Sequence, residues 1–347
     1  MKAVNRKRPI ILFSVLGLLV LTILLGPKPE TPDFSTIEIP VITSDLKALE
    51  DSIVAKEALL QLKPDNEARI VWSTPHQKTE YSMVYLHGLG GSPEEGDPVH
   101  EALAHRYGCN LYLARLEGHG LVSENPLQNV DPEQWMQSAL DAISIGKALG
   151  EKVIVVSCST GSTFALYLAA HYPELMEAQI LFSPNIDYYD PRSFMMAWPW
   201  GLQISRFILG SEFYGWKAPG AAQQYWYTRY RIEGLLVLKA IINKTMTEET
   251  FSKITKPVYM TFYYENENNQ DKIVSVKRME DMFAQLGTPE EKKKQVPLRK
   301  AGTHIITSDL FSNDIEEMWK PLITYCENIL HLTPVYNSDW KPFLDIR

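Results

Sequence analysis

A serine, a carboxylate and a histidine follow one another in an order that a nucleophilic hydrolase could use. Ser159 stands between two short apolar runs, Asp271 in an acidic loop, and His304 nearer the C-terminus. A serine hydroxyl becomes a useful nucleophile when a neutral imidazole removes its proton, and a carboxylate can fix the tautomer of that imidazole. The three residue types therefore predict acyl transfer to serine, a chemistry that requires no metal and no organic cofactor.

The nucleophile candidate lies in the segment Ser157-Cys158-Ser159-Thr160-Gly161. The pattern for a nucleophile on a tight strand-to-helix turn is G-x-S-x-G, and Ser157 here replaces its first glycine. As a bare pattern the segment also fits a serine-rich helix N-cap. The apolar strand at 152–157 and the helix-forming run up to His171 favour the turn, in which Gly161 supports the close packing and Thr160 offers a backbone N–H.

A glycine-rich loop, His87-Gly88-Leu89-Gly90-Gly91-Ser92-Pro93, follows an earlier apolar strand at 81–86. Such a loop can direct a backbone N–H at a substrate carbonyl, and we assign this oxyanion donor to Leu89, with Thr160 as the second. The loop also begins like the dinucleotide fingerprint G-x-G-x-x-G, but Pro93 occupies the place of the third glycine. We expect His87 and Gly88 to support the loop, His87 as an orienting residue and not as the catalytic base.

The acid and the base follow later strands. Asp271 comes after the strand at 257–264, and we choose it as the acid, with Glu265 and Glu267 as rivals in the same loop. His304 directly follows the strand at 295–300, and of the eight histidines it alone stands on a loop after a strand that comes later than both the serine and a carboxylate loop. Taken singly, Asp271 fits a helix N-terminal carboxylate and His304 a hydrogen-bonded loop histidine.

Strand and helix patterns alternate over most of the chain, which predicts a mainly parallel sheet with helices on both faces. We expect the core to comprise residues 45–183 and 256–330, interrupted by an insertion at 184–255 that breaks the alternation. Ligands of such sheets bind beyond the carboxyl ends of the strands, where the candidate residues stand.

These motifs resemble those of the α/β-hydrolase superfamily, in the branch that holds monoacylglycerol lipases, carboxylesterases and serine aminopeptidase-like proteins. The resemblance rests on 87–93, on Arg115-Leu116-Glu117-Gly118-His119-Gly120, on 130–135, on the Ser159 turn and on Gly302-Thr303-His304. It implies the α/β-hydrolase fold with a helical cap, Ser159 as nucleophile, Asp271 as acid, His304 as base, and Leu89 and Thr160 as oxyanion donors.

The insertion at 184–255 is rich in large aromatic side chains, which fit an apolar acyl pocket or the simple packing of a cap onto the core. We predict cleavage of a carboxylic ester with a lipophilic part, with a small-molecule or lipid ester as substrate. A peptide or amide hydrolase with the same triad is the alternative, as is a non-catalytic, membrane-anchored binding module with the same fold. The aromatic residues are Phe194, Trp198, Trp200, Phe207, Phe213, Tyr214, Trp216, Tyr225, Trp226, Tyr227 and Tyr230.

Charge and the termini suggest where the protein acts. The net charge of −8 among 347 residues argues against nucleic-acid binding. Lys2, Arg6, Lys7 and Arg8 precede an uncharged apolar run at 9–26, which predicts a transmembrane signal anchor with residues 1–8 cytoplasmic and the catalytic domain on the periplasmic or extracytoplasmic side. A cleaved signal peptide, giving a secreted protein, is the alternative. Residues 27–44 form a proline-rich linker and 331–347 a C-terminal tail.

The three cysteines, Cys109, Cys158 and Cys326, are too few for a disulfide framework. Cys109 and Cys158 lie in apolar strand contexts, which predicts that they are buried as small hydrophobic residues.

Overall fold

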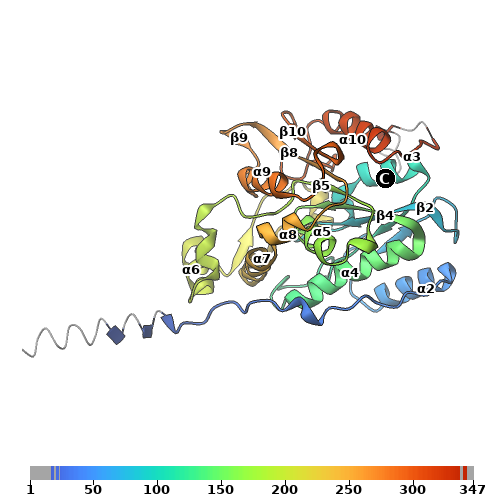
Figure 1. Cartoon of the computed structure of the whole chain (residues 1–347). Helices are drawn as coiled ribbons and strands as arrows, with labels where there is room; N and C mark the ends of the chain where they lie inside the picture. Colours follow the sequence, from blue (N-terminus) through green and yellow to red (C-terminus); the bar gives the residue numbers. More distant parts are fainter. Residues whose placement is uncertain (1–16, 19–20, 23, 337–338, 342–347) are drawn as a thin grey trace, which may run out of the picture.

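A mainly parallel sheet forms the centre of the molecule (Figure 1). The computed structural model describes residues 17–18, 21–22, 24–336 and 339–341. The main sheet has the strand order β1-β3-β2-β4-β5-β8-β10, and every pair along this path is parallel except the edge pair β1–β3. The strands are β1 (Arg69–Val71), β2 (Thr79–Leu86), β3 (Asn110–Leu113), β4 (Gly150–Cys158), β5 (Ala178–Phe182), β8 (Val258–Asn266) and β10 (Lys293–Leu298).

Alternate residues of the central strands belong to two hydrophobic clusters, one on each face of the sheet. Val84 and Leu86 of β2 pack on one face, and Met83 and Tyr85 pack on the other. The residues of β4 alternate in the same way along Val153–Val156. Successive side chains of a strand point to opposite faces, so a strand buried on both faces appears in the sequence as a continuous apolar run.

Helices cover both faces of the sheet (Figure 1). One face carries α2 (Leu46–Glu57), α4 (Pro132–Leu149), α5 (Thr160–His171), α7 (Ile232–Thr245), α8 (Glu248–Ser252) and α9 (Val276–Gln285). The other face carries α3 (Val99–Tyr107) and α10 (Glu316–Asn328). The predicted parallel sheet with helices on both faces is therefore confirmed.

The insertion at 184–255 contains shorter elements on one side of the core (Figure 1). Besides α7 and α8 it holds the 3-10 helix η4 (Pro191–Ala197), the helix α6 (Gly201–Leu209) and a small antiparallel pair, β6 (Phe213–Gly215) with β7 (Arg229–Arg231). Another short strand, β9 (Asn269–Gln270), pairs with the end of β8 to form a hairpin just before Asp271.

The segment that follows the predicted anchor lies along the core. Phe34 and Ile37 are buried in the cluster that contains α4. The N–H of Asp33 donates to Glu133 Oε1 at 2.7 Å, and the N–H of Glu38 donates to Gln137 Oε1 at 2.9 Å. These contacts fasten part of the proline-rich stretch 27–44 to α4.

The prediction of a transmembrane helix at residues 9–26 was wrong. Among the described residues, no helix is both long enough and apolar enough to cross a membrane. A crossing takes about 20 consecutive apolar helical residues, and the helical positions described in this stretch are 17–18, 21–22 and 24. The basic segment 1–8 and the start of the apolar run lie outside the described residues.

All three cysteines are buried and unbonded. Cys109 and Cys158 thus serve as small core residues, as predicted.

Candidate active site

Ser159 lies on a sharp turn between β4 and α5. Its backbone has φ +50° and ψ −116°, a conformation that residues other than glycine rarely adopt. The turn is held because the N–H of Ser159 donates to the Phe182 carbonyl at 3.0 Å, while its carbonyl accepts from the N–H of Asn185 at 3.0 Å. A strained serine between a strand and a helix is the arrangement that the nucleophile pattern requires.

The neighbours of Ser159 explain how the chain makes this turn. A Cβ atom at Gly161 would lie 2.1 Å from the Leu86 carbonyl oxygen, so α5 can approach the end of β2 only with glycine there. Ser157 is fully buried, and its hydroxyl forms a hydrogen bond with Ser162 Oγ at 2.9 Å. Serine therefore fits where the pattern has glycine, because its hydroxyl has a partner.

The loop after β2 fixes one peptide group beside the nucleophile. The Gly88 carbonyl accepts from His87 Nδ1 at 2.8 Å and from the N–H of Gly91 at 3.1 Å. Because the C=O and N–H of a trans peptide point in opposite directions, the N–H of Leu89 points away from these two donors. Leu89 lines the same cavity as Ser159 and Thr160. Thr160 is the first residue of α5, so its N–H has no acceptor within the helix.

His87 holds this loop in place through hydrogen bonds of both ring nitrogens. Its Nδ1 donates to the Gly88 carbonyl, and its Nε2 accepts from the N–H of Leu116 at 3.1 Å. Burial, followed by the neighbouring His119, keeps the pKa of His87 well below its ordinary value. A neutral ring with both nitrogens engaged is suited to orient the loop and has no free nitrogen to accept a proton.

Asp271 and His304 lie against each other at the same edge of the sheet. His304 Nδ1 is 2.5 Å from Asp271 Oδ2. The other oxygen, Oδ1, accepts from the N–H groups of Ile273 at 2.8 Å and Val274 at 3.1 Å. Asp271 is 1% exposed, so its carboxylate is fixed on both sides and orients the imidazole.

Two opposing effects set the pKa of His304. Burial alone would lower it, but the charge and the hydrogen bond of Asp271 outweigh burial, and the pKa is raised above its ordinary value of 6.5. This is the direction expected for an imidazole that must take up a proton beside a carboxylate.

The rival acids lie elsewhere. Glu265 and Glu267 are exposed in the β8–β9 hairpin, where Glu267 accepts from Tyr264 Oη at 3.2 Å. The hairpin accounts for the length of the acidic loop that precedes Asp271. Of the three candidate acids, the structure brings only Asp271 to His304.

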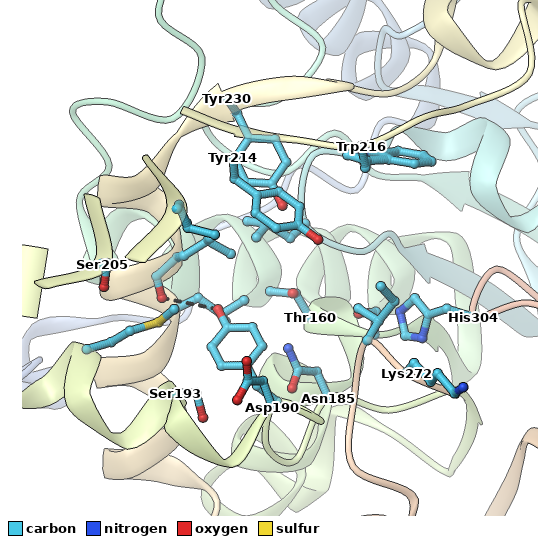
Figure 2. A pocket seen from close by; sticks show the side chains of 18 of the residues that line it. Thr160, Asn185, Asp190, Ser193, Ser205, Tyr214, Trp216, Tyr230, Lys272 and His304 are labelled. Atoms are coloured by element: carbon cyan, nitrogen blue, oxygen red, sulfur yellow. Dashed lines mark hydrogen bonds between the residues drawn. The ribbon is translucent and has the colours of Figure 1, made fainter. Parts of the chain in front are cut away.

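One cavity of about 550 Å³ contains Leu89, Ser159, Thr160 and His304 in its lining. Figure 2 shows Thr160, Asn185 and His304 facing this space, with the rings of Tyr214, Trp216 and Tyr230 across it. The aliphatic part of the lining comes mostly from the insertion, from residues Met195, Met196, Ile204, Ile208, Leu209, Leu235 and Leu238. A cavity of this size with a largely apolar lining suits a small organic ligand.

The aromatic residues of the insertion divide into groups. Tyr214, Trp216, Trp226 and Tyr230 line the cavity. In contrast, Phe207 is 87% exposed on α6, and Phe194 and Trp198 are about half exposed. The aromatic residues of the insertion therefore include both pocket-lining and exposed side chains.

The polar residues of the cavity that were not foreseen from the sequence include Glu95 and Asn185. Glu95 lies two residues beyond the glycine loop at 87–93, but the sequence does not show that its side chain is buried against that loop. Asn185 lies just beyond β5, and no pattern in the sequence sets it apart.

Comparisons with known proteins support this fold. A curated thermostable monoacylglycerol lipase from Bacillus sp. (strain H-257) is 31% identical over 93 residues, which are 27% of this chain and 36% of that enzyme. A solved structure from work on LipS and LipT, two metagenome-derived lipolytic enzymes, superposes with a TM-score of 0.63 and 16% identity, covering 77% of this chain and all of the other. The chain shares the fold of these lipolytic enzymes, the α/β-hydrolase fold.

Another solved structure, the monoacylglycerol lipase of Paleococcus ferrophilus, superposes with a TM-score of 0.55 and 16% identity over 77% of this chain and 98% of that one. At this identity the likeness shows the fold alone. The matched part spans about a third of the length of the curated lipase. No protein-family model matches the chain.

Proposed function

We propose that this α/β-hydrolase relative is a serine hydrolase that cleaves a carboxylic ester with a lipophilic part. The observation that carries the proposal is the His304–Asp271 pair, whose imidazole lines the same cavity as the strained Ser159. The relatives named as lipases favour an ester over other substrates of the same fold.

In the proposed mechanism, Ser159 Oγ attacks the ester carbonyl carbon while His304 takes the hydroxyl proton. The N–H groups of Leu89 and Thr160 stabilise the negative oxygen of the tetrahedral intermediate. Collapse of the intermediate breaks the bond to the alcohol oxygen, which leaves with the proton from His304. Water then attacks the acyl-enzyme with the same base, releasing the carboxylic acid and restoring the serine.

Three features of the site support this assignment of roles. The carboxylate of Asp271 holds the imidazole and opposes the effect of burial on its pKa. The partial positive charge at the start of α5 favours a developing oxyanion. The aliphatic lining contributed by the insertion offers an apolar site for an acyl chain.

The test is hydrolysis of p-nitrophenyl esters of increasing acyl length by the full chain, beside Ser159→Ala and His304→Ala. We expect turnover that both substitutions abolish and a kcat/KM that is higher for medium chains than for acetate. A folded wild-type protein that hydrolyses none of these esters would contradict the proposal. Turnover of the matching anilides in preference to the esters would replace it with an amide hydrolase.

A further inference from the structure

A glutamate that the proposed mechanism does not use is buried beside the nucleophile. Glu95 lies on the 3-10 helix η2 (Pro93–Gly96), directly after the oxyanion loop, and is 3% exposed. It also lines the catalytic cavity. The positive charge that acts on its carboxylate is that of His304. A buried carboxylate is costly for folding, so an apolar residue would suit a purely structural position better.

The carboxylate of Glu95 instead accepts hydrogen bonds from the catalytic framework. The N–H of Gly88 donates to its Oε2 at 2.5 Å, and the hydroxyl of Tyr85, at the end of β2, lies 3.4 Å from the same oxygen. Burial raises the pKa of Glu95, although the Gly88 N–H and the charge of His304 act in the other direction.

Gly88 is enclosed between this carboxylate and the nucleophile. A Cβ atom at Gly88 would lie 2.8 Å from Glu95 Oε1 and 2.9 Å from Ser159 Cβ. The position of the Gly88 backbone relative to the serine is therefore set from one side by Glu95 and from the other by the elbow.

The backbone of Glu95 makes a third connection. Its carbonyl accepts from Thr307 Oγ1 at 2.5 Å, three residues beyond His304. Glu95 thus touches the oxyanion loop through its side chain and the histidine loop through its backbone.

The hydrogen bonds of Gly88 show what this contact controls. The carbonyl of Gly88 is held by His87 and Gly91, and its N–H is held by Glu95. The peptide groups on both sides of Gly88 are therefore fixed. The Leu89 N–H belongs to the second of these groups, so its direction is fixed as well. Loss of the Glu95 acceptor would free the first peptide group and leave the second held only by the two hydrogen bonds to its carbonyl, so the direction of the Leu89 N–H would be less firmly fixed.

We propose that Glu95 is a positioning residue that holds the Gly88 backbone against the nucleophile elbow and so aims the Leu89 N–H at the oxyanion. The inference rests on the proposed serine mechanism for its kinetic consequence. Its structural consequence, a fixed Gly88 amide, does not depend on that mechanism.

The test compares Glu95→Met, Glu95→Gln and Glu94→Gln in the full chain. Methionine keeps the volume but removes the acceptor, whereas glutamine keeps an acceptor oxygen without the charge. Glu94 is a buried neighbour on the same 3-10 helix that does not line the catalytic cavity, so it is the matched control. Three quantities are measured: kcat and KM on a p-nitrophenyl ester, amide hydrogen exchange of the peptide 86–91, and the unfolding temperature.

We expect Glu95→Met to lower kcat by about 10- to 100-fold with little change in KM, because a misdirected oxyanion donor weakens transition-state binding. Exchange at the Gly88 amide should rise by about tenfold with the loss of one hydrogen bond. In Glu95→Gln, kcat and exchange at the Gly88 amide should stay close to the wild-type values, and Glu94→Gln should change neither quantity. The unfolding temperature of all three variants should stay close to that of the wild type.

Two results would overturn the inference. One is unchanged exchange of the 86–91 peptide in a folded Glu95→Met variant. The other is a parallel loss of kcat and unfolding temperature in which methionine and glutamine behave alike, which would make Glu95 a structural residue only. A wild-type protein without esterase activity would instead reject the proposed function, and the exchange experiment would still decide the role of Glu95.

Discussion

The core and the insertion position their parts of the site in different ways. In the core, strand ends and tight turns fix the positions of the site residues. Ser159 has a strained backbone, and Gly161 lies against the end of β2. The carboxylate of Asp271 accepts from two backbone N–H groups. In the insertion, short helices and a small β pair carry aromatic and aliphatic side chains, many of them partly exposed.

This difference separates reaction from recognition. Atoms that exchange protons or stabilise charge must be fixed to within a few tenths of an ångström, and the buried sheet can do this. Side chains that only enclose an apolar chain tolerate looser packing. Substitutions in the core should therefore change kcat or folding, and substitutions in the insertion should change the preference for substrate.

The largest effect is expected for Asp271→Asn. Asparagine retains an acceptor for the N–H groups of Ile273 and Val274, so the fold should persist. The imidazole loses its carboxylate, and kcat should fall by about 10⁴-fold, as such changes do in serine triads. Steady-state kinetics on a p-nitrophenyl ester measure this. Glu267→Gln, in the exposed hairpin, is the control, and a larger loss in that variant would move the acid to the rival position.

A glycine pair compares the packing of the two regions. Alanine at Gly161 would place Cβ 2.1 Å from a backbone oxygen, whereas alanine at Gly220, in the insertion, meets nothing within 4 Å. Gly161→Ala should cost about 2 to 4 kcal/mol of unfolding free energy, since the obstructing atom is backbone. Gly220→Ala should stay within about 0.5 kcal/mol of the wild type. Chemical denaturation gives both values, and equal effects would remove the contrast.

Two neighbours on α6 test recognition by the insertion. Ile208 lines the cavity, whereas Phe207 is mostly exposed and does not. Ile208→Ala should reduce kcat/KM for octanoate relative to acetate by about five- to tenfold, because apolar contact with the chain is lost. Phe207→Ala should leave that ratio unchanged. If the octanoate-to-acetate ratio of kcat/KM fell in Phe207→Ala and stayed unchanged in Ile208→Ala, the acyl chain would not bind against Ile208.

The smallest effect concerns pH. His304 must be neutral to accept the serine proton, and its pKa is raised because Asp271 outweighs the effect of burial. Activity should therefore decline as the pH falls through a value above 6.5, the ordinary pKa of the group. In Asp271→Asn, both contributions of Asp271 that oppose burial are lost and only the charge of Glu95 still raises the pKa of His304, so the acidic limb should move to lower pH. Profiles of kcat/KM against pH, one for the wild type and one for Asp271→Asn, measure the acidic limb of each protein. A wild-type limb centred below pH 6.5 would contradict the assigned direction of the pKa shift of His304.

The sequence predicted the core better than its surroundings. The strands and helices around Ser159 were found because residues buried on both faces give continuous apolar runs, and glycine turns mark their ends. The helix expected after the Ser159 turn, up to His171, is α5, which ends at that residue. The hairpin of β8 and β9 was missed because its turn residues, Asn266 to Asn269, resemble those of an ordinary polar loop.

The site was predictable where a residue type carries the chemistry, and less so elsewhere. Serine, aspartate and histidine in this order suggested a triad, and the structure brings Asp271 to His304. Glu95 escaped notice because its importance comes from burial and from contact with Gly88, neither of which a single sequence displays. The apolar run at 9–26 predicted a transmembrane helix from composition alone, and the described residues contain no helix of the required length and apolarity.

The central claim is that Ser159 is an activated nucleophile, and mapping a covalent label tests it most directly. The full chain is treated with a fluorophosphonate probe and digested, and the modified peptide is identified by mass spectrometry. The account predicts one modification, on Ser159, and its loss in His304→Ala. A folded wild-type protein that stays unmodified, or a label on another serine, would contradict it.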